Sequence, residues 1–266
     1  MLSVLWALAP RLRPLQAAGG RCILVALALL AACDRAGPMD RLPRRMVWAW
    51  ERPEDLRSLD PGRWGVAYLA WTFTIRGGDV VVHPRRQPLL LPAGTILMAV
   101  ARIEVDPAVP GLPGPAQQDL ILETILGGLR PEVAGLQVDF DARASARPFY
   151  RDLLAGLRRR MPPALPLAMT ALASWAFFDD WIRDLPVAEA VPMCFDMGAD
   201  GPWVRARLER GEDFRVPLAQ GATGVCLQEP LPRLPGHWWE GRRRIYVFSH
   251  APWTADRVAR AAAAYP

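Results

Sequence analysis

Short apolar runs rich in β-branched and aromatic residues recur along most of the chain. They lie at residues 46–50, 64–74, 95–104, 134–141, 165–174, 189–196, 222–228 and 244–250. Runs of this length, bounded by turn residues, predict buried β-strands. Four further segments have helical spacing or composition: 115–129, 148–160, 202–209 and 254–264. The chain therefore alternates between predicted strands and predicted helices.

This alternation, over about 220 residues, predicts an α/β fold of the (β/α)8 TIM-type barrel class. The pattern is irregular in three connections. The second connection, 76–92, has the pattern of a β-hairpin with Gly77-Gly78 at its turn, and the fifth and seventh are short or rich in proline. We therefore expect a trimmed barrel, with an open, doubly wound sheet as the alternative.

The first 32 residues have the pattern of a secretion signal. They contain three arginines and no acidic residue, and end in an apolar run over 22–32. A permanent membrane-spanning helix needs about 20 apolar residues, more than this run supplies. The run closes with Leu-Ala-Ala before Cys33, which resembles the bacterial lipobox. The resemblance implies cleavage before Cys33 and a lipid on its sulfur; an ordinary signal or anchor helix with an incidental cysteine is the alternative.

The predicted signal divides the chain into three parts. Residues 1–32 would be removed, residues 33–45 are polar and hold two prolines, as a tether does, and residues 46–266 would form the barrel domain. Asp34, directly after the cysteine, resembles a signal that retains lipoproteins at the inner membrane. We therefore expect a cell-envelope protein, lipid-anchored on the periplasmic side of the inner membrane, with the outer membrane as the alternative.

Charge and composition exclude several classes of function. Without the three arginines of the predicted signal, the net charge of +5 falls to +2, which gives no electrostatic basis for binding nucleic acid. The chain has no lysine, so neither a Schiff-base enzyme nor a P-loop nucleotide enzyme fits. The three histidines lie far apart in the sequence, without metal-ligand spacing. We expect no metal and no organic cofactor.

The strand predicted over 134–141 carries the strongest candidate site. Alternation places Gln137, Asp139 and Asp141 on one face, pointing into the barrel, and the apolar residues between them on the other. Buried polar groups are costly unless they are hydrogen-bonded or functional. Two close carboxylates also raise the pKa of one of them, as a general acid near neutral pH requires. The alternative is that Asp141 merely caps the next helix.

This segment resembles the D-x-x-D-x-D-x-E signature of the chitinase-like glycoside hydrolases. The resemblance implies that Asp141 takes the place of the acid that protonates the glycosidic oxygen. It also implies that Asp139 supports the acid and the substrate, and that Gln137 replaces an aspartate. Asp141 is one methylene shorter than the family's glutamate, and an acid misplaced by about 1 Å loses roughly a hundredfold in rate.

Two further segments resemble the same family. The segment 192–196, PMCFD, is similar to its M-x-Y-D motif, which implies a substrate-orienting role for Asp196. Phe195 stands where the family has a tyrosine, so the hydroxyl that would bind an acetamido oxygen is missing. Trp253, just after the eighth strand, resembles the tryptophan that forms the floor of the sugar site.

Beyond the predicted signal, the chain also resembles a family of uncharacterised bacterial exported proteins that share a domain of unknown function. The segments that carry this resemblance are 47–53, 136–142, 170–175 and 191–193. It implies a glycosidase-like barrel and no established activity.

Other strand ends add candidate substrate-binding residues. Glu104 shares a strand face with Arg102, which fits a binding role and an internal salt bridge equally well. Trp50, Trp71 and Trp175 end the first, second and fifth strands, where an indole either stacks on a sugar ring or packs in the core.

The seventh strand ends in Gln228, a further candidate for substrate binding. If Gln228 points into the barrel, alternation makes Cys226 do so as well. Cys194, next to an inward-pointing Phe195, would point outward. We therefore expect no disulfide between the two cysteines.

Three functions remain open on the sequence. The first is a monomeric enzyme that cleaves an envelope polysaccharide, with N-acetylglucosamine as a candidate unit, Asp141 as acid and Asp139 and Asp196 as supporting groups. The second is a glycan-binding lipoprotein without catalysis. The third is a structural lipoprotein in which the polar residues hold the barrel together.

Overall fold

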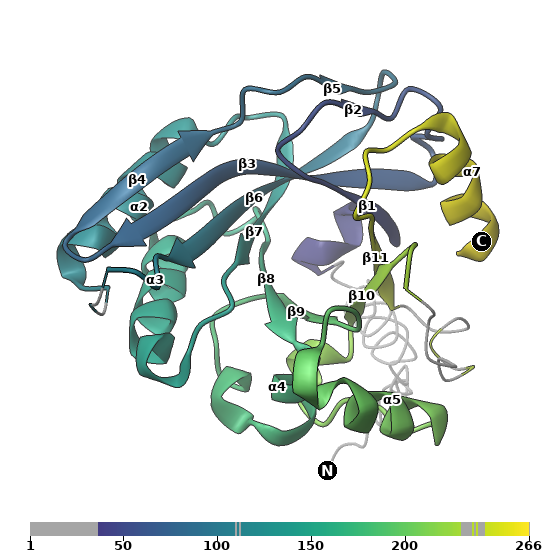
Figure 1. The fold of residues 1–266 in the computed structure, drawn as a ribbon. Helices are drawn as coiled ribbons and strands as arrows, with labels where there is room; N and C mark the ends of the chain where they lie inside the picture. Colours follow the sequence, from purple (N-terminus) through teal and green to yellow (C-terminus); the bar gives the residue numbers. More distant parts are fainter. Residues whose placement is uncertain are drawn as a thin grey trace, which may run out of the picture. The chain divides into compact units, whose positions relative to one another are not determined.

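Eight parallel strands close into a barrel in the computed structural model, which describes residues 37–109, 111, 113–229, 236, 238 and 243–265 (Figure 1). The predicted signal and Cys33 lie outside the described residues. β1 pairs with β3 on one side and with β11 on the other, so the sheet is closed and the open-sheet alternative is wrong. In chain order the barrel strands are β1 (Arg45–Ala49), β3 (Trp64–Arg76), β6 (Ile96–Val105), β7 (Val133–Asp139), β8 (Leu167–Leu172), β9 (Glu189–Met193), β10 (Ala222–Cys226) and β11 (Arg244–Phe248).

Helices cover the outside of the barrel where the chain crosses from strand to strand. They are α2 (Pro115–Gly128), α3 (Arg147–Arg160), α4 (Ala173–Phe178), α5 (Gly201–Glu209) and α7 (Ala255–Ala264). Four of them lie where the sequence predicts them. The fifth connection contains only the short α4 and a 3-10 turn, which confirms that this connection is trimmed. Among the described helices, none combines the length and the apolar character needed to cross a lipid bilayer.

The second connection is a β-hairpin, as predicted. β4 (Asp79–Pro84) returns antiparallel along the far half of β3, and Arg76 pairs with Asp79 across the turn. Gly77 has a φ of 58°, the left-handed region in which glycine has no steric cost. The chain then forms β5 (Leu89–Leu90), which pairs with β2 (Glu54–Asp55) in a small separate sheet.

The apolar residues form two layers. The outer layer lies between strands and helices and includes Leu136, Val138 and Phe140 of the β7 segment. The inner layer fills the barrel and includes Trp48 and Tyr246. The predicted alternation of β7 is confirmed, because the Nε1 of Trp48 donates a hydrogen bond across the barrel to Gln137.

The N-terminal end of the barrel is closed by residues that precede β1. Leu42 is 3% exposed and packs with the inner layer, and Met39 lies against it. Arg244 donates to the carbonyl oxygens of both residues and forms an ion pair with the buried Glu189. This part of the predicted tether therefore belongs to the folded domain, because its two apolar side chains gain more by packing than by extension into water.

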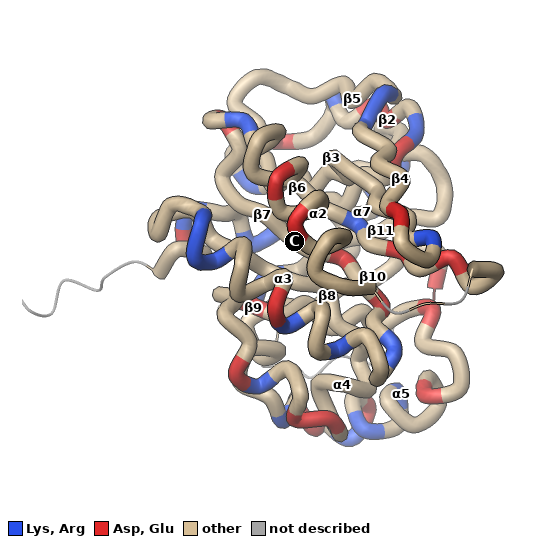
Figure 2. Tube along the Cα trace, turned by 90° about the vertical axis from the view of Figure 1, so that its left-hand side faces the viewer, with Lys and Arg blue, Asp and Glu red and all other residues tan. Residues whose placement is uncertain are grey.

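Charged residues of both signs are interspersed over the fold. In the view of Figure 2, acidic and basic positions alternate along the loops and helices and do not separate onto different faces. No large patch of one sign is therefore seen in this view.

Candidate active site

A pocket of about 180 Å³ opens at the C-terminal ends of the barrel strands. Its walls come from the ends of six strands, as expected for a barrel of this class. Four predicted site residues line it: Trp50, Asp139, Asp141 and Asp196. The structure therefore brings together residues that are up to 146 positions apart in the sequence, between Trp50 and Asp196.

Asp139 lies at the bottom of this pocket, held by two donors. Arg102 is its direct cross-strand partner on β6, and their side chains form a hydrogen-bonded ion pair. The hydroxyl of Thr170 donates to the other carboxylate oxygen at 2.6 Å. Burial opposes the charge of Arg102, but the Asp139 and Glu104 carboxylates outweigh it and raise the pKa of the guanidinium. Asp139 is thus fixed in place as a charged partner of Arg102.

Asp141 lies at the mouth of the pocket, two residues further along the chain. Desolvation, reinforced by the Asp139 carboxylate and opposed by Arg102, raises the pKa of Asp141 to about 6. Its carboxylate remains accessible to solvent. Among the described residues, no donor is hydrogen-bonded to it. The expected rise in the pKa of one carboxyl group is therefore found at Asp141, with burial as its largest cause and Asp139 as the second.

A second cavity, of about 270 Å³, meets the first at Arg102 and Asp141, which line both. Glu104 lines this second cavity and forms an ion pair with Arg102 at 2.7 Å, so the salt bridge considered from the sequence is present. Arg143 lines its other side. Asp141 therefore stands at the junction of two adjoining cavities.

The segment that follows β9 adds Phe195 and Asp196 to the pocket wall. Phe195 points inward, as predicted, and packs on Phe248 with ring centroids 4.7 Å apart. Asp196 has a φ of 46°, the only positive value outside glycine among the described residues. Aspartate tolerates this region better than most residues. The backbone N–H of Asp196 donates to the Glu229 carboxylate at 3.1 Å, which holds the turn.

Trp50 and Gln137 occupy different depths. Trp50 is half-buried and lines the pocket, with Trp48 packed against it edge to face at 4.3 Å and the Arg102 guanidinium 5.5 Å from its ring centroid. Trp48 and Arg102 therefore hold the Trp50 indole in place. Gln137 lies one layer deeper, fully buried against Trp48, and does not line the pocket.

Trp71 does not reach the pocket. The ladder between β3 and β6 shifts register between Leu69 and Trp71, which marks a β-bulge. Leu69 belongs to the inner layer, whereas Ala70 and Trp71 both belong to the outer layer. Because the extra residue reverses the alternation, Trp71 packs outside the barrel against Gly128, where α2 ends.

Trp175 and Trp253 also lie away from the pocket. β8 ends at Leu172, and Trp175 falls on α4, which turns it outward to pack on Trp181 with centroids 4.9 Å apart. Trp253 follows β11 as expected but is 1% exposed in the outer layer. Its Nε1 donates to the Trp48 carbonyl oxygen at 3.0 Å. Trp175 and Trp253, two candidate platforms for a sugar ring, therefore serve in packing.

Gln228 lies beside the pocket without lining it. Its amide donates to Ser249, and its oxygen accepts from the backbone N–H of His250, so it ties β10 to the end of β11. Cys226 is in the inner layer and Cys194 in the outer layer. Both thiols are free, which confirms that no disulfide joins them.

The sequence argument left several pocket residues unassigned. Phe248, Met193, Ser174 and Asp200 all line the pocket. Alternation with the inward-pointing Tyr246 is the signal that could have placed Phe248. Asp200 follows a turn after β9, where no alternation of apolar and polar residues predicts the direction of its side chain.

Comparisons with known proteins are sparse. No protein-family model and no curated protein sequence matches this chain. Membership of the uncharacterised exported family therefore stays a prediction. Among solved structures, the chain is similar to the Bacillus cereus spore cortex-lytic enzyme SleL, with 17% sequence identity and a TM-score of 0.45. The match covers 72% of this chain and 54% of that one, so the chain spans about half the length of that structure. No conclusion about the reaction follows from a likeness of this size.

Proposed function

We propose that the protein hydrolyses a polysaccharide of the cell envelope, with Asp141 as the general acid. The observation that carries this proposal is the position of Asp141 at the junction of two cavities, with a pKa raised to about 6. A general acid in glycoside hydrolysis must reach the oxygen between two sugar units and be protonated near the working pH. Asp141 meets the first requirement by its position between two cavities and the second by its raised pKa.

The neighbouring residues have supporting roles in this proposal. Asp139, held by Arg102 and Thr170, orients the substrate and stabilises positive charge at the reacting carbon. Asp196 contacts the sugar from the part of the pocket wall that follows β9. The exposed face of Trp50 stacks on the apolar face of a sugar ring.

An N-acetylglucosamine unit fits this set of residues, because no second protein nucleophile is then needed. The acetamido oxygen of the substrate attacks the anomeric carbon while the bond to the glycosidic oxygen breaks, and Asp141 gives its proton to that oxygen. Water then attacks the cyclic intermediate and returns a proton to Asp141. A lipid on Cys33 would hold the domain at the membrane surface, close to such a polymer.

The test is cleavage of chitin-type and poly-N-acetylglucosamine oligosaccharides by the full-length protein in detergent. We expect Asp141→Asn to lower the rate by about 100-fold or more, in line with the usual contribution of a general acid. Asp119→Asn, on the exposed face of α2, is the matched control and should keep the parent rate. Equal rates for the parent and Asp141→Asn would disprove the assigned role.

Binding without catalysis is the second candidate, and two observations favour it. Phe195 offers no hydroxyl to the pocket, and Asp141 has a shorter side chain than the glutamate of the family it resembles. This candidate predicts that the parent and Asp141→Asn bind the same oligosaccharides in calorimetry and that neither cleaves them.

A further inference from the structure

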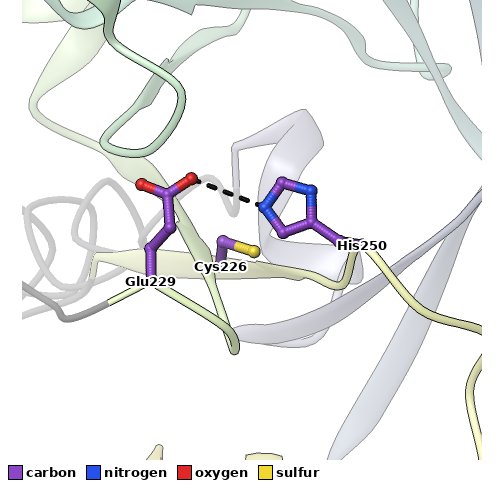
Figure 3. A group of neighbouring side chains, drawn as sticks. All are labelled: Cys226, Glu229 and His250. Atoms are coloured by element: carbon purple, nitrogen blue, oxygen red, sulfur yellow. Dashed lines mark ion pairs between the residues drawn. The ribbon is translucent and has the colours of Figure 1, made fainter.

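Three residues of metal-binding type gather at the ends of β10 and β11, beside the pocket. Figure 3 shows the side chains of Cys226, Glu229 and His250 close together. One ligand atom from each residue, a sulfur, a carboxylate oxygen and a ring nitrogen, lies within 4.8 Å of the other two. In the described part of the chain, this is the one such group of three. No local sequence pattern predicts this group, because its members lie at or just after the ends of two different strands.

The spacing of this group suits a small tetrahedral cation. The Nε2 of His250 lies 3.4 Å from the Oε1 of Glu229. Zinc binds nitrogen and oxygen at about 2.0–2.2 Å, so a tetrahedral site separates these two ligands by about 3.4 Å. The Cys226 sulfur lies within 4.8 Å of both atoms, and it forms a longer bond to zinc, of about 2.3 Å. Only a small shift of side chains would bring all three atoms onto one ion.

The surroundings hold these ligands in place. The second oxygen of Glu229 faces Arg205 at 3.4 Å, which leaves the first oxygen turned toward His250. Gln228 accepts hydrogen bonds from the Cys226 thiol at 3.3 Å and from the His250 backbone N–H at 3.0 Å. An outer partner such as Arg205 orients a ligating carboxylate in known metal sites, whereas the hydrogen bond from the Cys226 S–H to Gln228 would give way to the zinc–sulfur bond.

The mixture of donors distinguishes the group from an ordinary ion pair. A contact between His250 and Glu229 needs no sulfur, yet the Cys226 sulfur lies within 4.8 Å of both of their ligand atoms. Magnesium and calcium select oxygen ligands, whereas sulfur and nitrogen together select zinc and related metals. Asp196, whose Oδ2 is 3.9 Å from the His250 Nε2, adds negative charge and a further possible ligand.

We propose that Cys226, Glu229 and His250 bind one Zn²⁺ ion, with Asp196 or a water molecule in the fourth position. On binding, the Cys226 S–H gives its proton to solvent, a zinc–sulfur bond forms, and the imidazole binds as the neutral ring. The metal site does not require the proposed glycan hydrolysis to be correct, although the two share Asp196. Since Glu229 also accepts the N–H of Asp196, the ion would fix the turn that carries Asp196 on the pocket wall.

Cobalt titration tests the sulfur ligand directly. Full-length protein in detergent, stripped with a chelator, is titrated with Co²⁺ and followed by absorption. We expect a thiolate-to-cobalt band in the near ultraviolet that saturates at one ion per chain and is absent in Cys226→Ser. Cys194→Ser is the matched control, because Cys194 is an equally buried thiol in the outer layer, and it should keep the band. A band that persists in Cys226→Ser would overturn the proposal.

Competition with a zinc indicator tests the nitrogen ligand. His250→Ala should weaken Zn²⁺ binding by more than about 100-fold, beyond the 10–100-fold that outer partners contribute, while the exposed His83→Ala should leave it unchanged. Binding should also weaken as the pH falls, because protons compete for sulfur and nitrogen. His250 is half-exposed, so this variant decides the question even if Cys226→Ser does not fold. Unchanged zinc affinity in His250→Ala would exclude the site.

Discussion

Asp139, the last residue of β7, and Asp141, two residues further along the chain, have different immediate neighbours. Asp139 forms an ion pair with the Arg102 guanidinium and accepts a hydrogen bond from the Thr170 hydroxyl. Asp141 is desolvated instead, and this burial, reinforced by the Asp139 carboxylate, raises its pKa to about 6. Two carboxyl groups that alternation places on one face therefore differ in their surroundings: Asp139 is paired, whereas Asp141 has no hydrogen-bond donor among the described residues.

The raised pKa of Asp141 predicts a pH-dependent stability. Between its ordinary pKa of 3.8 and the folded value of about 6, the folded protein holds this proton more tightly than the unfolded chain does. The contribution of Asp141 is therefore most favourable below pH 4 and is lost as the pH rises through 6. Because asparagine does not ionise, Asp141→Asn should raise the melting temperature relative to the parent, more at pH 7 than at pH 4.

Thermal unfolding of both proteins from pH 4 to pH 7.5 gives this comparison, with Asp119→Asn as a control for loss of a surface charge. A lower melting temperature for Asp141→Asn at every pH would mean that the carboxylate stabilises the fold. The polar residues of β7 would then be structural.

The sequence places the carboxylates well and the tryptophans poorly. A period of two determines the face of Gln137, Asp139 and Asp141, and a charge inside a barrel has few explanations. An indole suits the core and a sugar platform equally well, so sequence position alone does not separate Trp50 from Trp175. The cluster around His250 depends on contacts between strands, which no local pattern reports.

At the scale of the elements, the eight strands and four longest helices could be predicted with ends within a few residues. Apolar runs and helical spacing carry that information. Two irregularities could not be predicted. The bulge in β3 is a backbone event without a sequence signature here, and α4 begins inside the apolar run 165–174, where strand and helix have the same composition.

Two glycines at the end of α2 allow a test of how Trp71 packs, which the bulge in β3 determines. An alanine at position 128 would place its Cβ 2.9 Å from the buried Trp71 ring, whereas one at position 127 would meet no atom within 4 Å. Gly127→Ala should stabilise the protein by up to about 1 kcal/mol through helix propensity. Gly128→Ala should be less stable than Gly127→Ala by about 1–3 kcal/mol, because a packed ring must move.

Urea unfolding of the two glycine variants measures this difference, and the parent serves as the common reference. Equal stabilisation by both alanines would mean that Trp71 does not pack against α2. The indole would then be free to face elsewhere.

Considered as a whole, the barrel has a polar group at each end of its interior and an apolar layer between them. Asp139 and Arg102 occupy the pocket end. Glu189 and Arg244 occupy the other end, where the Tyr246 hydroxyl also donates to Glu189 at 2.7 Å. Burial raises the pKa of Glu189, against the opposing effect of Arg244. The buried carboxylate of Glu189 therefore depends on both Arg244 and Tyr246 for its stabilisation.

This dependence predicts an asymmetry between single and double substitutions. Arg244→Met should destabilise the protein by about 3–5 kcal/mol, because it leaves a buried carboxylate without its cation and releases the Met39 and Leu42 carbonyl groups. Adding Glu189→Met removes the uncompensated charge, so the double variant should recover part of the loss. Tyr246→Phe, which keeps the ion pair, should cost only about 1–3 kcal/mol. Urea unfolding of the three variants at pH 7 compares these costs. A double variant less stable than Arg244→Met alone would show that hydrogen bonds to the N-terminal segment, and not the ion pair, close this end of the barrel.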